Sequence, residues 1–194
     1  MQNQTYKAPI YNGQMNQGLC IKKNKGRIIM ELICGTSTYQ LDTIIDEYST
    51  LLYHVAMVRM QNKEDAEDIV QDAFLRLLQQ IQKGKTFESK EHLKAWLLTV
   101  VTNRGKSILT LAWNKRTQGL DSAMKIAAPE KDTDYAYEYV MRLPEKYRVA
   151  IDLFYYQELT TEQIAQIMKT KPTTVRSYLH RGRQKLKEMM EVDA

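Results

Sequence analysis

The sequence predicts an all-α protein with two small helical domains joined by a flexible linker, the second of them a helix-turn-helix. Apolar residues recur with a helical period over residues 38–113 and again over residues 134–190. Between these stretches, residues 114–133 show no such period and include Gly119 and Pro129. With 194 residues and 43% hydrophobic content, the chain is large enough for one or two small cores.

The N-terminal residues 1–37 are polar, rich in Gln and Asn, and aperiodic, which predicts a mostly disordered tail with a short ordered piece at residues 28–33. The predicted domains are then residues 38–113, a linker over residues 114–133, and residues 134–194. Such a linker is long for a compact protein, which favours a functional role. Beyond Val100-Val101 we find almost no β-strand signal.

Composition excludes several classes of protein. The net charge of +5 and the pI near 9.0 agree with a polyanionic partner, although 26% charged residues is an ordinary content. No apolar run has the length of a membrane span, and the run at residues 28–34 is too short, and interrupted by Glu31, for a signal peptide. Cys20 and Cys34 have neither the spacing nor the partners of a zinc site. We therefore expect a cytoplasmic protein without membrane insertion, metal or other cofactor.

An acidic helix is predicted to begin at Glu64. Asp65, Asp68 and Asp72 fall in one narrow stripe, nearly opposite an apolar side that contains Ile69. Acids in a first turn complement the helix dipole, but Asp72 lies further in. Two interpretations stay open here: a docking surface for a basic protein, or a solvated face.

The next predicted helix, residues 92–104, is strongly apolar, and for most of its residues a core position is the better interpretation. Aromatic, amide and basic side chains are interleaved along and after it, which suits single-stranded nucleic acid because bases stack on rings and phosphates meet cations. The candidate residues are Trp96, Thr99, Asn103, Arg104, Lys106, Lys115 and Arg116.

No catalytic site is predicted. Gly105-Lys106-Ser107 matches the end of a phosphate-binding P-loop, but the position of the leading glycine holds Val100 and the context is helical. The three histidines, His54, His92 and His180, are scattered and form no nucleophile or metal arrangement. We therefore expect that the protein is not an enzyme.

The C-terminal segment predicts a helix-turn-helix. Thr160 and Gln163 form a capping box at the start of a short helix, and Leu159 and Ile164 occupy the positions of a hydrophobic staple. Pro172 opens the second helix, at the one position where a missing N–H costs nothing. From residue 160 to 190 there are seven Lys/Arg and two Glu, whereas a merely solvated face would more often mix charges. We therefore favour duplex DNA as the partner, with an amphipathic hairpin as the alternative.

On the second helix we assign two sets of DNA-binding candidates. The side chains suited to read base edges are Thr173, Thr174, Arg176, Ser177 and His180. Those suited to hold phosphates are Lys171, Arg181, Arg183 and Lys185.

The order of these parts, with a Leu143-Pro144 break before the helix-turn-helix, resembles the extracytoplasmic-function group of bacterial RNA polymerase sigma factors. The matching stretches are residues 65–77, 93–97, 143–148, 159–165 and 174–183, so the resemblance covers residues 38–190. Three ordered motifs in one chain are far more specific than any one of them.

The resemblance implies a role for each part. The acidic helix, through Asp65, Asp68, Gln71 and Asp72, would dock on the basic coiled coil of the polymerase's largest subunit. The helix with Trp96 would capture and open the minus-ten element, the linker would run toward the RNA exit channel, and the helix-turn-helix would read the minus-thirty-five element. The implied partners are core RNA polymerase and promoter DNA, and an anti-sigma factor would be a further one.

The sequence departs from the family's pattern at two places. Ser107 and Thr110 stand where the family usually has Asp and Arg, which makes the minus-ten face less charged. In the turn of the helix-turn-helix, Lys169 replaces the usual Gly and Lys171 the capping Ser, so Lys169 should be left-handed or the turn should differ. Two other functions stay open: a stand-alone helix-turn-helix regulator, and a sigma-like interaction protein that no longer initiates transcription.

Overall fold

The computed structural model describes residues 19–24, 27–117 and 135–193, and the side chains of residues 31–105 and 136–193. The first half of the predicted tail and residues 118–133 of the predicted linker therefore lie outside the described residues. The strands are β1 (Leu19–Asn24), β2 (Arg27–Cys34) and β3 (Ser37–Gln40). The helices are α1 (Leu41–Met60), α2 (Lys63–Gln82), α3 (Lys90–Thr117), α4 (Tyr135–Arg142), α5 (Glu145–Tyr155), α6 (Thr161–Ile167) and α7 (Pro172–Val192).

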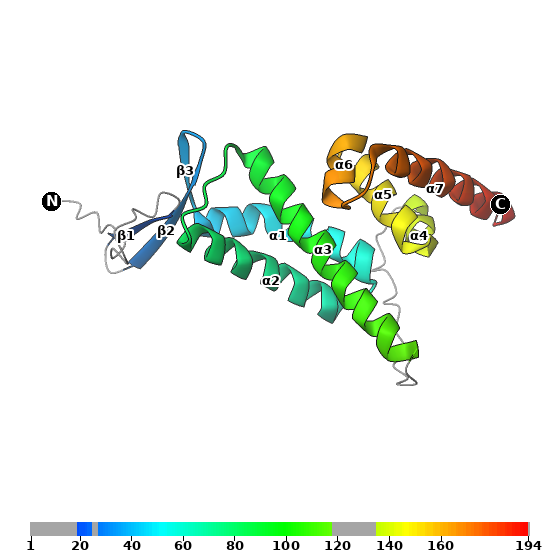
Figure 1. The fold of residues 1–194 in the computed structure, drawn as a ribbon, viewed down its shortest axis with the longest axis horizontal. Helices are drawn as coiled ribbons and strands as arrows, with labels where there is room; N and C mark the ends of the chain where they lie inside the picture. The colour runs from blue at the N-terminus through cyan, green and yellow to red at the C-terminus, as the bar shows by residue number, and fades with distance from the viewer. Residues whose placement is uncertain (1–18, 25–26, 118–134, 194) are drawn as a thin grey trace. The chain divides into compact units, whose positions relative to one another are not determined.

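Helices dominate the described chain, and the predicted all-α class with a C-terminal helix-turn-helix is confirmed (Figure 1). Acids in the first turn of α2 and the proline at the start of α7 lie where local helix rules place them. The break at Pro144 separates α4 from α5. Helix α3 continues to Thr117, beyond Trp113, where the helical pattern was predicted to end.

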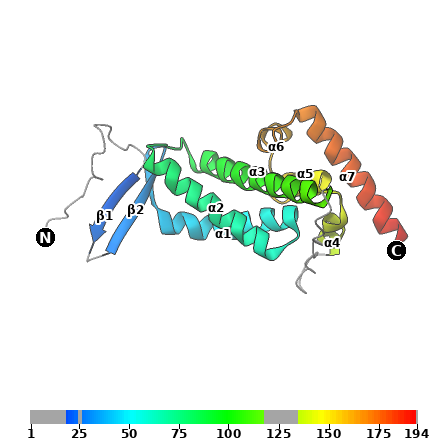
Figure 2. The same cartoon turned by 60° about the horizontal axis from the view of Figure 1, so that its bottom comes forward.

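Part of the predicted tail is ordered: residues 19–24 and 27–34 form strands of a three-stranded antiparallel sheet in the order β1-β2-β3, and the short ordered piece expected at residues 28–33 lies in β2. Leu32 pairs on both sides, with Leu19 on β1 and with Tyr39 on β3, and Figure 2 shows β1 and β2 side by side. Leu32 and Cys34 are buried. The β-branched apolar run of β2 suits a strand, and it pairs along its length with β1 and β3. Its end also forms a bridge with Phe87, a contact between distant residues that a local reading of the sequence cannot detect.

The chain divides into two compact units, each assembled from segments that are distant in sequence. The first takes Met1–Leu51 and Gln71–Leu97, and the second takes Leu52–Val70 and Leu98–Ala194. The largest fully buried side chains of the first unit are Leu32, Ile44, Leu77, Ile81, Phe87, Leu93 and Leu97. Those of the second are Leu52, Met60, Ile69, Leu98 and Leu143.

A buried arginine ties together three segments of the second unit. The Arg148 guanidinium donates to the carbonyls of Leu143 at 2.9 Å, Met141 at 3.1 Å and Arg59 at 3.2 Å, and its Nε donates to the carbonyl of Val58. Burial lowers the pKa of Arg148 from its ordinary high value. One side chain therefore satisfies carbonyls at the end of α1 and around the α4–α5 break.

None of the helices in the described part of the chain is long and apolar enough to cross a membrane.

Candidate nucleic-acid interface

The helix-turn-helix begins with the predicted capping box at α6. The Gln163 N–H donates to Thr160 Oγ1 at 3.2 Å, and the Thr160 N–H donates to Gln163 Oε1 at 2.9 Å. Both groups would otherwise be unpaired donors at a helix start. The geometry confirms the prediction and fixes where the short helix starts.

The turn confirms the left-handed alternative for Lys169, whose φ is 51°. The next amide, that of Thr170, donates to the Ala165 carbonyl at 2.9 Å and closes the helix end. Lys171 is the N-terminal cap of α7 and makes no side-chain capping bond. Its carbonyl instead accepts from the amides of Thr174 and Val175 at 2.9 and 3.1 Å. The left-handed conformation of Lys169 costs on the order of 1 kcal/mol relative to glycine. The turn forms with lysine at this position all the same.

Helix α7 buries one face and presents the other to solvent. Val175, Leu179 and Gly182 are buried, as the helical period requires. Thr174 is half-buried. The other predicted DNA-binding residues are all exposed: Lys171, Thr173, Arg176, Ser177, His180, Arg181, Arg183 and Lys185.

Two of these arginines have partners that sequence analysis missed. Arg176 donates to Glu162 Oε1 at 3.0 Å, from α7 to the first turn of α6. Hydrogen bonds from its own backbone N–H and from the Thr161 hydroxyl, together with nearby Arg176, lower the pKa of Glu162. Arg183 donates to Tyr155 Oη at 3.3 Å. These contacts join different helices, so no spacing along the sequence indicates them.

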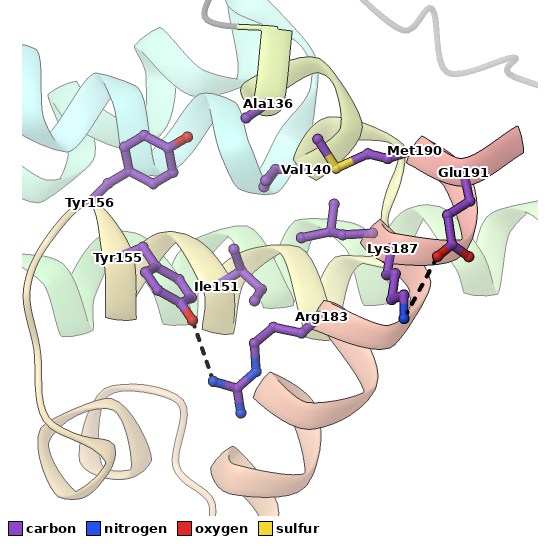
Figure 3. A pocket seen from close by; sticks show the side chains of 10 residues that line it. Ala136, Val140, Ile151, Tyr155, Tyr156, Arg183, Lys187, Met190 and Glu191 are labelled. Carbon is purple, nitrogen blue, oxygen red and sulfur yellow. Dashed lines mark hydrogen bonds and ion pairs between the residues drawn. The ribbon is translucent and has the colours of Figure 1, made fainter. Parts of the chain in front are cut away.

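Among the hollows beside the described residues of α7, two are large. One, of about 750 Å³, is lined by basic and polar side chains of α7 and by Phe154 and Thr161. The other, of about 630 Å³, lies between α4, α5 and the C-terminal half of α7 (Figure 3). It is mainly apolar and is lined by Ala136, Val140, Ile151, Tyr155, Tyr156, Arg183, Leu186, Lys187, Met190 and Glu191. Sequence analysis missed this groove. The signal for it was that Tyr155 and Met190 are large apolar residues at helix positions that do not face the core.

The minus-ten candidates lie along α3. Trp96 is half-buried, and its ring meets the Phe87 ring edge-on at 5.6 Å between centroids. The Asn103 side-chain amide donates to the Thr99 carbonyl at 2.6 Å, and Arg104 is exposed. The remaining positions belong to α3, but their side chains lie outside the described residues: Lys106, Ser107, Thr110, Lys115 and Arg116.

Gly105, which carried the likeness to a P-loop, has a packing role. A Cβ at this position would lie 2.5 Å from Cδ of Arg59, so any larger residue would force the Arg59 side chain to shift. The residue lies within a continuous helix, as argued from the sequence. Phosphate binding is therefore not needed to explain it.

The acidic residues lie along α2. Asp68 and Gln71 are exposed, and Asp65 and Asp72 are half-buried. Asp72 Oδ2 accepts from Arg76 Nε at 2.8 Å, so its charge is partly balanced. The Asp65 N–H donates to Asn62 Oδ1 at 2.9 Å, a helix cap that sequence analysis missed although Asn is a preferred capping residue.

Comparison with known proteins yields two family matches. Sigma-70 region 2 matches residues 44–113, and Sigma-70 region 4 matches residues 133–186. The chain is 28% identical to the ECF RNA polymerase sigma factor SigW of Bacillus subtilis, over 76% of this chain and 87% of SigW. It is 26% identical to SigM of the same organism, over 77% of this chain and 94% of SigM.

A solved structure shares the fold. The sigma factor RpoE in complex with the anti-sigma factor NepR from Bartonella quintana matches with a TM-score of 0.64 and 23% identity, over 79% of this chain and 98% of that one.

Proposed function

The chain belongs to the extracytoplasmic-function group of sigma-70 factors, which bind core RNA polymerase and direct promoter recognition, and we propose how its surfaces divide that work. The observation that carries the proposal is that one chain holds both an exposed basic helix, α7, behind a helix-turn-helix turn and an acidic helix, α2, within the region 2 match. The protein would act in the cytoplasm, with no catalytic site and no cofactor of its own.

The acidic side of α2 would dock on a basic surface of core polymerase. Asp68 and Gln71 are exposed and carry most of this surface, with Asp65 and Asp72 at its margin. Charge reversal of Asp65, Asp68 and Asp72 should weaken core binding by at least about tenfold, because like charges then face each other. Glu191→Lys, at an exposed acid of α7, is the matched control. Unaffected binding of the triple variant would favour a regulator that uses the helix-turn-helix alone.

The exposed half of α7 would read the minus-thirty-five duplex. Thr173, Thr174, Arg176, Ser177 and His180 would meet base edges. Lys171, Arg181, Arg183 and Lys185 would hold phosphates and so position the helix.

Arg183→Ala tests this division of roles. Loss of one phosphate contact should weaken all DNA sequences alike and flatten the salt dependence by about one unit. If the variant instead changed sequence preference and kept the salt slope, Arg183 would belong to the base-reading set.

The N-terminal half of α3, together with the residues that follow it, would capture the minus-ten element. Trp96 offers a ring for stacking, Thr99 and Asn103 offer polar groups, and Arg104, Lys106, Lys115 and Arg116 offer positive charge. Ser107 and Thr110 make this set less charged than in the family's usual pattern. A weaker preference at the minus-ten element is the expected result.

Run-off transcription tests the whole proposal. Purified core polymerase is mixed with the full chain and a library of duplexes that is randomised at both promoter elements, and the transcripts are sequenced. Selective transcripts that need the chain support it. Core binding without transcripts would instead identify a sigma-like interaction protein.

An anti-sigma factor is the regulator we propose. The support is that the matched RpoE structure was solved with the anti-sigma factor NepR. Capture of a protein that blocks core binding by this chain would test it.

A further inference from the structure

We propose that the hairpin β2–β3 positions the minus-ten surface, by holding the loop of residues 83–89 against which Trp96 packs. The proposal rests on the role assigned above to Trp96. The hairpin ends at Gln40, before the region 2 match begins at residue 44, so neither family match accounts for it. Its role is therefore indicated by its contacts alone.

Main-chain hydrogen bonds join the hairpin to the loop. The Gly35 N–H donates to the Phe87 carbonyl at 2.7 Å, and the Phe87 N–H donates to the Ile33 carbonyl at 3.4 Å. Cys34 and Phe87 form a parallel bridge. In the described residues, β1 pairs with β2 as far as Leu32. Phe87 pairs with β2 two residues further on, at Cys34. The loop is thus fixed as a short extension of the sheet.

The same loop residue is the support of Trp96. Phe87 is only 1% exposed, and its ring centroid lies 5.6 Å from that of Trp96, with the rings at 65°. Lys85, in the same loop, places its Nζ 5.1 Å from the centroid of the indole. A displacement of the loop would therefore move or uncover the indole, which is the ring proposed to stack on an unpaired base.

Strand β3 makes a second attachment, at the first residue of α3. Lys90 Nζ lies 4.6 Å from the ring centroid of Tyr39 and 2.6 Å from Glu47 Oε2. The Tyr48 hydroxyl donates to the Lys90 carbonyl at 3.4 Å. The start of the helix that carries Trp96 is thus held by β3 and by α1.

Gly35 sets the distance between hairpin and loop. Its φ is +60°, and a Cβ there would lie 2.6 Å from the Glu88 carbonyl oxygen. Any side chain at this position must push the two backbones apart. Gly35→Ala is therefore a direct way to displace the loop, and Thr36→Ala, at the exposed neighbour, is its matched control.

The experiment measures the affinity of the holoenzyme for two probes made from the promoter that run-off selection defines. One is a fork with a single-stranded minus-ten element, and the other is a duplex with the minus-thirty-five element alone. Gly35→Ala should bind the fork roughly tenfold or more weakly, since small misplacements of a binding group are costly. Tyr39→Leu, which removes the aromatic ring from Lys90 but keeps an apolar side chain, should lose about two- to fivefold. Core affinity and duplex affinity should stay at the wild-type level in both variants.

Two outcomes would overturn the proposal. Wild-type fork affinity in both variants would show that the loop does not need the hairpin. An equal loss of core and fork affinity in both would show that the hairpin only stabilises the first unit. Tyr39→Leu keeps the test decisive if Gly35→Ala fails to fold. A wild-type holoenzyme with no preference for the fork would instead contradict the proposed function.

Discussion

Replacement of Arg148 by alanine is the sharpest test of how the second unit is held together. The guanidinium is buried and donates to four main-chain carbonyls, at Val58 and Arg59 in α1 and at Met141 and Leu143 around the α4–α5 break. A buried acceptor that loses its donor costs about 1–3 kcal/mol. Water entering the gap will pair some of the four, so we expect a total of about 3–5 kcal/mol, as for other broken buried charge interactions.

Hydrogen exchange of the full chain, read by mass spectrometry on peptides from residues 145–155, measures this loss where it occurs. A cost of about 3–5 kcal/mol corresponds to protection that falls by roughly a hundredfold to a few thousandfold. Arg148→Lys is the matched variant, because it keeps the charge but has no planar fork of donors, and it should show an intermediate loss. A less than tenfold decrease in the alanine variant, or full protection in the lysine variant, would refute the reasoning.

Three further predictions concern single contacts. Thr160→Ala removes the cap of α6 and should lower the free energy of unfolding, measured in urea, by about 1 kcal/mol. The double variant Thr160→Ala/Gln163→Ala should lose less than the sum of the two single losses, because both residues belong to one capping box. Gly182→Leu should lower the free energy of unfolding by about 1–3 kcal/mol, since even a Cβ at this position would lie 3.1 Å from Ile151 Cγ1. An unchanged thermal unfolding curve would show that the Ile151 side chain moves aside without cost. Burial raises the pKa of Tyr48 to about 12, so the folded state keeps a proton that the unfolded chain loses above pH 10. Stability should be complete below pH 10 and decline toward pH 12 by about 2 kcal/mol, and Tyr48→Phe should lack this part of the decline in urea titrations across that range.

The features that local sequence rules govern were predictable. The capping box at Thr160, the break at Pro144 and the helix start at Pro172 each depend on neighbours within four residues, and all three are confirmed. The left-handed conformation of Lys169 was one of two expectations, and it came from the resemblance, because Lys169 stands where the family usually has Gly. These elements were visible because the physics that forms them is local.

The features that were missed depend on contacts between distant segments. The pairing of Phe87 with Cys34, at the end of β2, joins the hairpin to a loop that no window around residues 27–34 contains. The pairing of Arg176 with Glu162 and the apolar groove beside Met190 likewise require knowledge of which helices pack together. Exposure along α7 could be predicted from helical period alone, but the orientation of its side chains could not.

The ion pair between Glu162 and Arg176 has a consequence for how the chain searches for its sites. Both side chains are more than half exposed, so the pair adds little to folding stability. It does cancel one positive charge on the helix that would face DNA. One fewer effective cation lowers the affinity for arbitrary DNA at low salt. It also makes that affinity less sensitive to salt, so that a fourfold rise in salt reduces it by a factor that is roughly fourfold smaller, according to counterion release. Free chains would therefore spend less time on unrelated DNA and more time available for capture by polymerase.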